Sequence, residues 1–178
     1  TLDGIAKGYI VDAMADALSG HGATRFLINA GGDIRAAGDR GDKLPWTIAV
    51  RDPEDKVPSW DNESWQRSIV PDLIQITAGG VATSGSYEVY FDRDRLAHHI
   101  VKGQTGRSPT HAMSVTVAAA TTMEADALAT AVFVLGPNEG KRLIDELDGC
   151  ECLIIDRQGK QARSSGWGGI ATSGSKPE

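Results

Sequence analysis

The grouping of strands along the chain is the feature that most constrains its fold. Short apolar segments bounded by glycine, proline and polar residues predict strands, and they occur in clusters with helical segments between them. The first three predicted strands are expected to form a meander, and residues 87–91 and 96–101 are expected to form the two arms of a hairpin. This pattern favours an α+β or mixed α/β fold with mixed or antiparallel sheets over a doubly wound parallel sheet. The predicted strands are residues 25–30, 34–37, 46–50, 72–77, 80–83, 87–91, 96–101, 113–120 and 152–156.

Helical periodicity predicts three helices that pack on these strands. The first covers residues 5–18 and is ended by glycines. The second begins with a capping box, in which the hydroxyl of Thr121 caps the helix and the carboxylate of Glu124 follows three residues later. It is expected to end near residue 135. The third covers residues 138–148.

Composition is typical of a soluble globular protein of one domain. The chain has 178 residues, 40% of them hydrophobic, and no apolar run reaches the roughly 20 residues that span a bilayer. A formal net charge of −6 argues against a nucleic-acid-binding surface. The mixed charges of residues 51–56 indicate a solvated loop. We expect a folded domain over residues 1–165 and a flexible Gly/Ser-rich tail over residues 166–178.

The two cysteines, Cys150 and Cys152, are separated by one residue. A disulfide across this spacing is strained, and a metal site would need further cysteine or histidine ligands nearby. Two ordinary, partly buried thiols are therefore expected, and the redox compartment stays open.

The start of the first helix and the turn after the first strand carry two candidate sites. Gly4 and Gly8 let the backbone approach a ligand closely, and a helix N-terminus favours anions such as phosphate. An ordinary helix start with a surface Lys7 is the alternative. The glycine pair within residues 29–34 indicates either a ligand-facing loop or a simple turn. It is not a dinucleotide-binding fingerprint, because no helix follows it.

Two more candidates lie further along the chain. The small hydroxyl residues within 82–87 could line a pocket or make a turn. They lead to His98 and His99, which would face opposite sides of a strand, so at most one is expected in a given site. Asp126 and Thr130 share one helix face and could hold Mg²⁺, which prefers hard oxygen ligands. A solvated aspartate beside a threonine bonded to its own helix is the alternative.

Taken together, these four stretches resemble the C-terminal half of the ApbE family, the FAD:protein FMN transferases. The resemblance spans about residues 2–156 and implies an ApbE-like, T-fold-like α+β architecture in which the N-terminal part of the family fold is missing. It rests on Gly-Ile-Ala-Lys-Gly-Tyr at 4–9, Gly-Gly-Asp at 31–33, Ala-Thr-Ser-Gly-Ser-Tyr at 82–87, His-His-Ile at 98–100, Thr-Gly at 105–106, Ser-Val-Thr-Val at 114–117 and Ala-Asp-Ala-Leu-Ala-Thr-Ala at 125–131.

The resemblance implies a magnesium site and its ligands. In the family, a backbone carbonyl at the position of Gly4 binds Mg²⁺ together with the residues that match Asp126 and Thr130. The ion would bridge the diphosphate of FAD and neutralise charge as one phosphoanhydride bond breaks. Asp126 is therefore expected to be catalytic as well as metal-binding.

The resemblance also implies contacts to FAD. Lys7 and Val101 match family positions that contact FAD, and Thr1 stands at a position of the same site where the family usually has Asp. His99 matches the family's candidate for a catalytic or positioning role. Its imidazole could accept the proton of an acceptor hydroxyl, which attacks the phosphorus on the FMN side while AMP leaves.

Three departures from the family pattern bear on this site. Thr1 replaces the usual Asp, and Asp3 replaces the usual Gly or Ser. Any carboxylate role at the position of Thr1 is therefore lost or is taken over by Asp3. Lys102-Gly103 replaces a rigid, acidic Asp-Pro turn. The N-terminal portion that supplies much of the FAD pocket in family members is missing. Three explanations fit this absence. The chain is a fragment, a second chain supplies the missing half, or the protein no longer binds FAD in the usual way.

The implied function is Mg²⁺-dependent transfer of FMN from FAD to a Ser or Thr hydroxyl in the flavinylation motif of an acceptor protein, with release of AMP. An FAD pyrophosphatase, in which water replaces the hydroxyl, and a non-catalytic flavin-binding module are the alternatives. A free Thr1 acting as a nucleophile after self-cleavage has no other support in the sequence. Since family members are mostly exported, often as lipoproteins, a periplasmic or membrane-anchored location is expected.

Overall fold

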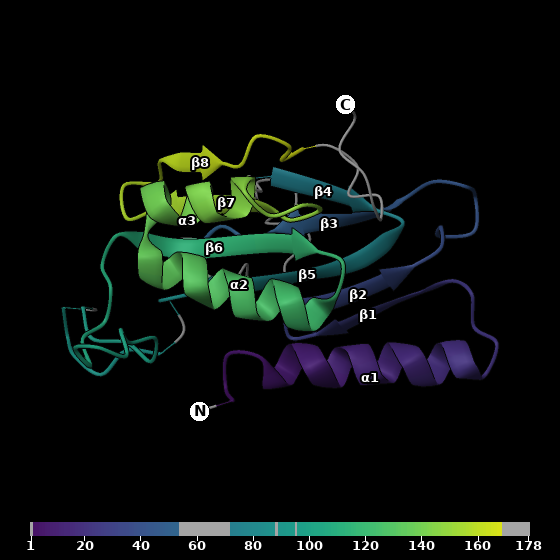
Figure 1. Cartoon of the computed structure of the whole chain (residues 1–178), viewed down its shortest axis with the longest axis horizontal. Coiled ribbons are helices and arrows are strands. Elements are labelled where there is room, and N and C mark those ends of the chain that lie inside the picture. The colour runs from purple at the N-terminus through teal and green to yellow at the C-terminus, as the bar shows by residue number, and fades with distance from the viewer. Residues whose placement is uncertain (1, 54–71, 88, 95, 169–178) are drawn as a thin grey trace, which may run out of the picture.

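The chain folds into three layers, which the computed structural model shows for residues 2–53, 72–87, 89–94 and 96–168 (Figure 1). The middle layer is an antiparallel six-stranded sheet with the strand order β1-β2-β5-β6-β7-β8. Helices cover one face of this sheet, and a separate two-stranded sheet of β3 and β4 covers the other. The predicted α+β class with antiparallel sheets is confirmed.

All three predicted helices are present, and their ends lie within three residues of the prediction. As predicted, the hydroxyl of Thr121 caps the second helix by accepting a hydrogen bond of 3.2 Å from the Glu124 amide. No helix in the described part of the chain is long and apolar enough to cross a membrane. The elements are α1 (Ala6–Gly20), β1 (Phe26–Ala30), β2 (Asp33–Ala37), β3 (Trp46–Val50), β4 (Asp72–Ile76), β5 (Ala78–Gly85), β6 (Ala112–Ala119), α2 (Thr122–Leu135), α3 (Pro137–Asp145), β7 (Glu151–Asp156) and β8 (Gln161–Arg163).

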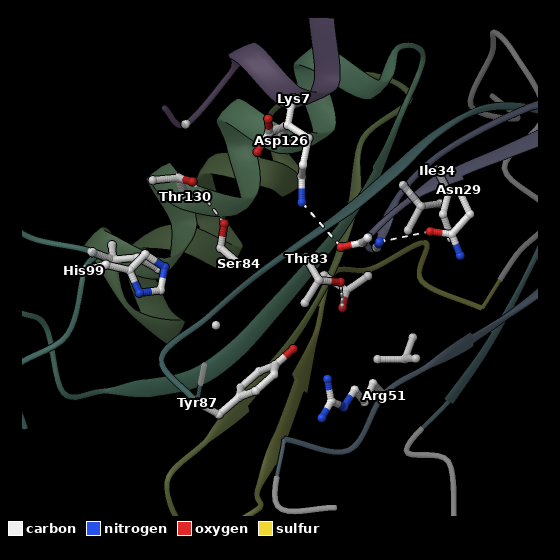
Figure 2. A pocket seen from close by; sticks show the side chains of 18 of the residues that line it. Lys7, Asn29, Ile34, Arg51, Thr83, Ser84, Tyr87, His99, Asp126 and Thr130 are labelled. Carbon is white, nitrogen blue, oxygen red and sulfur yellow. Dashed lines mark hydrogen bonds between the residues drawn. The ribbon is translucent and has the colours of Figure 1, made fainter. Parts of the chain in front are cut away.

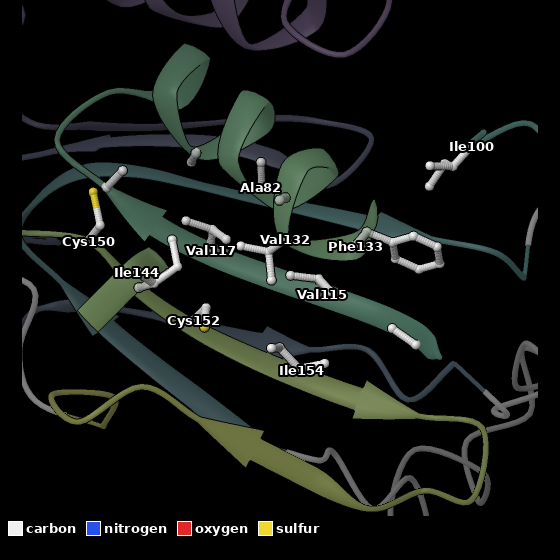
Figure 3. Close-up of a cluster of buried hydrophobic side chains, with 14 residues drawn as sticks. Ala82, Ile100, Val115, Val117, Val132, Phe133, Ile144, Cys150, Cys152 and Ile154 are labelled. Atoms are coloured by element: carbon white, nitrogen blue, oxygen red, sulfur yellow. The ribbon is translucent and has the colours of Figure 1, made fainter. Parts of the chain in front are cut away.

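Two hydrophobic cores hold the layers together. One lies between the helices and the six-stranded sheet and includes Phe133 of α2 with Val115 and Val117 of β6, all fully buried (Figure 3). Because side chains alternate between the faces of a strand, Ala118 of β6 contributes to the opposite core. That second core lies between the two sheets and contains Ile34, Ala36, Ile48, Val50, Ile74, Ile76, Val81, Ala118, Leu153 and Ile155.

The predicted meander is wrong for its third strand. β3 pairs with β4 instead of continuing the sheet of β1 and β2. Ile48 and Val50 of β3 and Ile74 and Ile76 of β4 form one buried apolar face. A sheet with such a face is stable only when the face is covered, so the pair stacks on the large sheet rather than extending its edge.

The predicted hairpin is also wrong in its pairing. Among the described residues of its two arms, only one isolated bridge forms, between Tyr90 and His98. The carboxylate of Asp92 accepts hydrogen bonds of 2.9 Å from the amides of both Leu96 and Ala97. These donors are therefore satisfied inside the turn and not by a strand ladder. The short strand β8 was not predicted.

Cys150 and Cys152 are unpaired thiols, as predicted, and both are buried rather than partly buried. Burial raises the pKa of each thiol to about 11. Neither is therefore a thiolate near neutral pH, the form in which cysteine is reactive. Both belong to the core between the helices and the sheet, where they act as packing residues.

The packed part of the chain continues to Trp167. Its indole Nε1 donates a hydrogen bond of 2.8 Å to Asp72, and its side chain packs on the core between the two sheets. The amide of Gly166 donates to the Glu151 carboxylate at 3.1 Å. The flexibility predicted for the tail stays a prediction for residues 169–178, which lie outside the described residues.

α1 crosses α2 at Gly8, where there is no room for a side chain. A Cβ atom on Gly8 would lie 2.5 Å from the carbonyl oxygen of Thr122. One turn further along α1, the carboxylate of Asp12 accepts hydrogen bonds of 3.0 and 2.8 Å from the amides of Thr122 and Met123. Amides in the first turn of a helix have no partner within the helix. α1 therefore both packs against α2 and caps it.

β5 extends past β2, and this overhang exposes the edge beside which the candidate site lies. The ladder between β2 and β5 ends where Ile34 pairs with Val81, whereas β6 pairs with β5 as far as Gly85. Within the described residues, the last four residues of β5 therefore have a strand partner on one side only.

The substitution Gly8→Ala is expected to destabilise the fold by about 1–3 kcal/mol, because the new methyl group would overlap the backbone of α2. Gly20→Ala is the matched control, since a Cβ atom at Gly20 would meet nothing within 4 Å in the same helix. That change is expected to be neutral or slightly stabilising. Urea unfolding of the three proteins measures both effects, and equal midpoints for the two variants would contradict the close crossing.

Candidate functional site

A cavity of about 660 Å³ lies beside the overhanging end of β5 (Figure 2). Its walls come from the start of α1, the turn between β1 and β2, the end of β3, one face of α2 and the segment 99–101. Thr1 lies outside the described residues. The other residues predicted from the sequence all line this cavity: Gly4, Lys7, His99, Val101, Asp126 and Thr130.

Asp126 is nearly buried at the point where α1 meets α2. It is 8% exposed, and its Oδ2 accepts a hydrogen bond of 3.0 Å from the backbone amide of Gly8. This amide belongs to the first turn of α1, where backbone N–H groups and the helix dipole favour a negative charge. The hydrogen bond therefore sets the orientation of the Asp126 side chain.

Thr130 and Gly4 lie next to each other beside this carboxylate. A Cβ atom on Gly4 would lie 3.5 Å from Oγ1 of Thr130, an ordinary contact distance, so the backbone of Gly4 lies near the threonine hydroxyl. Thr130 follows Asp126 by one helical turn, and its hydroxyl lies 3.0 Å from Oγ of Ser84 on β5. The tertiary structure thus brings together the three residues that the sequence predicts as metal ligands.

The carbonyl of Gly4 is available for a ligand. α1 begins at Ala6, so Gly4 lies before the helix. The amide of Gly8 donates to Asp126, and no backbone amide of the described residues donates to the Gly4 carbonyl. The Gly4 carbonyl is therefore a second oxygen at the site without a backbone donor.

The donors in this part of the cavity fit Mg²⁺. A carboxylate, a hydroxyl and a backbone carbonyl are hard oxygen ligands, and protein Mg²⁺ sites often combine one or two carboxylates with water and substrate phosphate. No group of three or more His, Cys, Asp and Glu side chains that could hold a metal occurs among the described residues.

Hydroxyl residues of β5 line the cavity, in agreement with one of the two interpretations of residues 82–87. Besides Ser84, Thr83 contributes its Oγ1, which lies 2.9 Å from Oγ1 of Thr116 on the neighbouring strand β6. The cavity wall along this strand is therefore polar.

The glycine pair between β1 and β2 forms a tight turn that faces the cavity. Gly31 and Gly32 have φ values of 63° and 100°, which residues other than glycine rarely adopt. The amide of Gly32 donates a hydrogen bond of 2.9 Å to the side-chain oxygen of Asn29, which stabilises the turn. Asn29 and both glycines line the cavity. The motif is thus a turn that also faces the cavity.

Asp33 follows this turn and forms an ion pair with Lys7. Nζ of Lys7 lies 3.0 Å from Oδ1 of Asp33 and donates a longer bond of 3.4 Å to the carbonyl of Gly31. Burial raises the pKa of Asp33 to about 6, and the nearby carboxylate of Asp126 adds to this increase, while Lys7 opposes it. Asp33 was not among the predicted site residues, although it is part of the Gly-Gly-Asp motif at 31–33 on which the family resemblance rests.

The two adjacent histidines separate as predicted. His98 is 2% exposed, its Nε2 lies 2.9 Å from the carbonyl oxygen of Pro109, and its ring packs edge-on against Phe133. Ser108 holds the backbone of His98 through two further hydrogen bonds. His99 is exposed and lines the cavity. His98 is therefore an anchor that holds His99 at the cavity wall.

The opposite end of the cavity carries an aromatic ring and a cation. The guanidinium carbon of Arg51 lies 5.4 Å from the ring centre of Tyr87, and the ring covers Gly85 so closely that a Cβ atom there would be 2.2 Å from it. Figure 2 shows Tyr87 and Arg51 side by side, well separated from Thr130 and Asp126. As predicted, Arg51 is exposed and lies in a loop, and because it directly follows β3 it also lines the cavity wall.

Comparison with known proteins assigns the family. The sequence profile of the ApbE family matches residues 1–154. This chain belongs to the ApbE family. The resemblance drawn from the sequence motifs is thereby confirmed.

The relatives of this ApbE-family chain are longer than the chain itself. It is 34% identical over 160 residues to a protein of Escherichia coli K12 named FAD:protein FMN transferase, covering 89% of this chain and 42% of the relative. It is 39% identical over 141 residues to the protein of that name from Vibrio cholerae, covering 78% and 39%. The crystal structure of the ApbE protein of Thermotoga maritima matches with a TM-score of 0.78 at 34% identity, covering 92% of this chain and 50% of that one. The chain thus spans half or less of the length of these relatives.

The departures of this ApbE-family chain from the family pattern have structural counterparts. Asp3 lines the cavity, so a carboxylate is present near the start of α1. The turn that begins at Lys102 is closed by hydrogen bonds, because its carbonyl accepts from the amides of Thr105 and Gly106 at 3.1 and 2.7 Å. The turn that contains Gly103 is therefore held by backbone hydrogen bonds.

Substitution of the two histidines is expected to separate folding from function. His98→Gln should lower the free energy of unfolding by roughly 1–3 kcal/mol, because it removes a buried ring and disturbs its hydrogen bond. His99→Gln should change it by less than about 0.5 kcal/mol, since the side chain is exposed. Thermal unfolding of both variants measures this difference, and a large loss of stability in His99→Gln would show that His99 is a packing residue.

Stability should depend on pH through Asp33. Its pKa is raised from 3.8 to about 6 in the folded chain, so the protonated form favours folding. This contribution is present in full below about pH 4 and is lost as the pH rises through about 6. Without metal, the wild-type chain should lose roughly 1–3 kcal/mol relative to Asp33→Asn between pH 4 and pH 7. Urea unfolding in EDTA measures this loss, and parallel pH profiles would contradict it.

Proposed function

We propose that this chain carries the metal- and diphosphate-binding half of an FAD:protein FMN transferase. The observation that carries the proposal is the placement of the Gly4 backbone, the Asp126 carboxylate and the Thr130 hydroxyl at one end of a cavity, with Lys7 beside them. Oxygen donors for a hard cation next to an ammonium group are what binding of a diphosphate needs. The names of the relatives support FAD as the substrate and a protein as the acceptor.

The chain's own residues supply binding and orientation. Gly4, Asp126 and Thr130 would hold Mg²⁺, which when bound would neutralise charge on the diphosphate of FAD. Lys7 extends into the cavity beside the Gly31-Gly32 turn and would contact the phosphate oxygens from the other side (Figure 2). The hydrogen bond from Gly8 holds Asp126 in place before any ligand enters.

His99 is the group proposed to handle the proton. It lines the same cavity as the metal donors and is exposed, so both a substrate and solvent can reach its ring. The Ser or Thr oxygen of the acceptor forms a bond to the phosphorus on the FMN side, while the bond from that phosphorus to the bridging oxygen breaks. The proton of the hydroxyl passes to His99, and the bridging oxygen leaves as part of AMP.

The remaining contacts to FAD are proposed to come from polypeptide outside this sequence. The chain covers 42% of its E. coli relative, so more than half of that protein has no counterpart here. The Val101 side chain, which is 46% exposed at the cavity wall, and the Tyr87 end of the cavity are the places where such polypeptide could meet the ligand.

Removal of the Asp126 charge is expected to abolish the chemistry. With FAD, Mg²⁺ and a peptide with an Asp-Gly-Ala-Thr-like motif, the chain should release AMP and attach FMN to the peptide. Asp126→Asn should reduce both products at least about 100-fold, because its amide can still accept from Gly8 but no longer offers a charged metal ligand. Asp16→Asn, an exposed change on α1, is the control and should have no effect.

Liquid chromatography for AMP and mass spectrometry of the peptide measure the two products separately. AMP without a peptide adduct would indicate a pyrophosphatase, in which water is the acceptor. Undiminished AMP release by Asp126→Asn would contradict the metal assignment, and no AMP from the wild-type chain would contradict catalysis by this chain alone.

A further inference from the structure

Asp33 is a buried carboxylate to which the proposed chemistry gives no role. It is 1% exposed, although aspartate is rarely buried to this extent unless all of its oxygens are paired. Oδ1 pairs with Lys7, but Oδ2 is buried and has no hydrogen-bond partner in the described part of the chain. An unpaired buried oxygen on a charged group costs stability. Packing therefore does not explain why an aspartate occupies this position.

The local structure around Asp33 is built to present it to Lys7. The left-handed Gly31 and Gly32 reverse the chain directly before it, and Asn29 holds this turn through the Gly32 amide. Asp33 is the first residue of β2, so the strand fixes its backbone. Its carboxylate therefore has little freedom to move away from Lys7.

Lys7, by contrast, has a long side chain that is 49% exposed. An unrestrained lysine samples many rotamers, and fixing it on binding an anion costs conformational free energy. The ion pair with Asp33 and the bond to the Gly31 carbonyl hold its ammonium group at the cavity wall. Figure 2 shows this side chain extended from α1 toward the turn, on the same side of the cavity as Asp126.

We propose that Asp33 is a positioning residue that holds the Lys7 ammonium group in the place where it meets the diphosphate of the ligand. This inference rests on the proposed function, since it takes FAD as the ligand. Asp33 does not touch the ligand in this proposal and acts only through Lys7. Because the pair is neutral overall, the carboxylates left for a metal ion at this end of the cavity are those of Asp126 and Asp3.

A simple charge effect makes the opposite prediction. If Asp33 acted only through its own negative charge, its removal would strengthen the binding of an anionic ligand. If it acts by positioning Lys7, its removal weakens binding, because the lysine must be ordered when the ligand arrives. The sign of the change in affinity therefore separates the two explanations.

The experiment compares the wild-type chain with Asp33→Asn, Lys7→Met and the double variant. Binding of FAD in the presence of Mg²⁺ is followed by flavin fluorescence. Each single change should weaken binding by about tenfold, and the double variant should be no weaker than Lys7→Met alone, because the two residues act as one unit. Unchanged or tighter binding by Asp33→Asn, or effects that multiply in the double variant, would overturn the proposal.

A second measurement does not depend on the ligand, so it distinguishes failure of this inference from failure of the proposed function. Acylation of lysines by a water-soluble ester is quantified by mass spectrometry, with the exposed Lys160 as an internal reference. Asp33→Asn should raise the labelling of Lys7 several-fold relative to Lys160, because the ion pair no longer restrains the amine. Unchanged labelling would overturn the proposal even if the chain binds FAD.

The stability of Asp33→Asn at pH 7 completes the test. A positioning residue can be removed without loss of folding, and residues at functional sites often reduce stability. Asp33→Asn should therefore unfold at the same temperature as the wild type or at a higher one. A fall of several degrees would show that Asp33 is a structural residue and would overturn the proposal.

Discussion

The hydrogen bond from the Gly8 amide to the Asp126 carboxylate connects the fold to the site. It joins the first turn of α1 to α2 at 3.0 Å, and it forms only because Gly8 has no side chain where a Cβ atom would meet the Thr122 backbone at 2.5 Å. The same bond orients Asp126 beside the Gly4 carbonyl, which precedes α1 and accepts from no backbone amide of the described residues. The missing side chain of Gly8 therefore governs both the packing of the two helices and the orientation of the Asp126 carboxylate.

Burial of the Asp33 carboxylate, with repulsion from Asp126 as a smaller contribution, is the electrostatic cost of this arrangement. Two carboxylates, Asp33 and Asp126, lie near one ammonium group, and the raised pKa of Asp33 shows that the charged form is unfavourable where it is buried. A cation bound at Asp126 would offset the repulsion between the carboxylates, and a ligand that binds only the folded state stabilises it. Binding of a cation would thus change the balance of charges in the site.

Much of the fold could be predicted from local patterns, and the failures have one cause. The helices and most strands follow from periodicity and from caps such as Thr121, which act over a few residues. The pairing of β3 was mispredicted because its partner β4 begins at Asp72, more than 20 residues after β3 ends at Val50. The place of the exposed Arg51 at the cavity wall could not be predicted for the same reason, since it follows from the position of β3. For the histidines, the sequence indicated that at most one would enter the site but did not indicate that Pro109 and Phe133 would bury His98.

The sequence by itself determined the α+β class, the boundaries of the helices and the residue types available for chemistry. Its motifs, which resemble those of the ApbE family, also indicated which of these residues to expect at the site. Only the packing of the folded chain places Gly4 near Thr130, lets Asp126 accept from Gly8, and pairs Asp33 with Lys7. The reason is the separation along the chain over which each kind of interaction acts. Periodicity and capping act between neighbours in the chain, whereas the site depends on close approach between groups up to 126 positions apart, which only the packing of helices and sheets fixes.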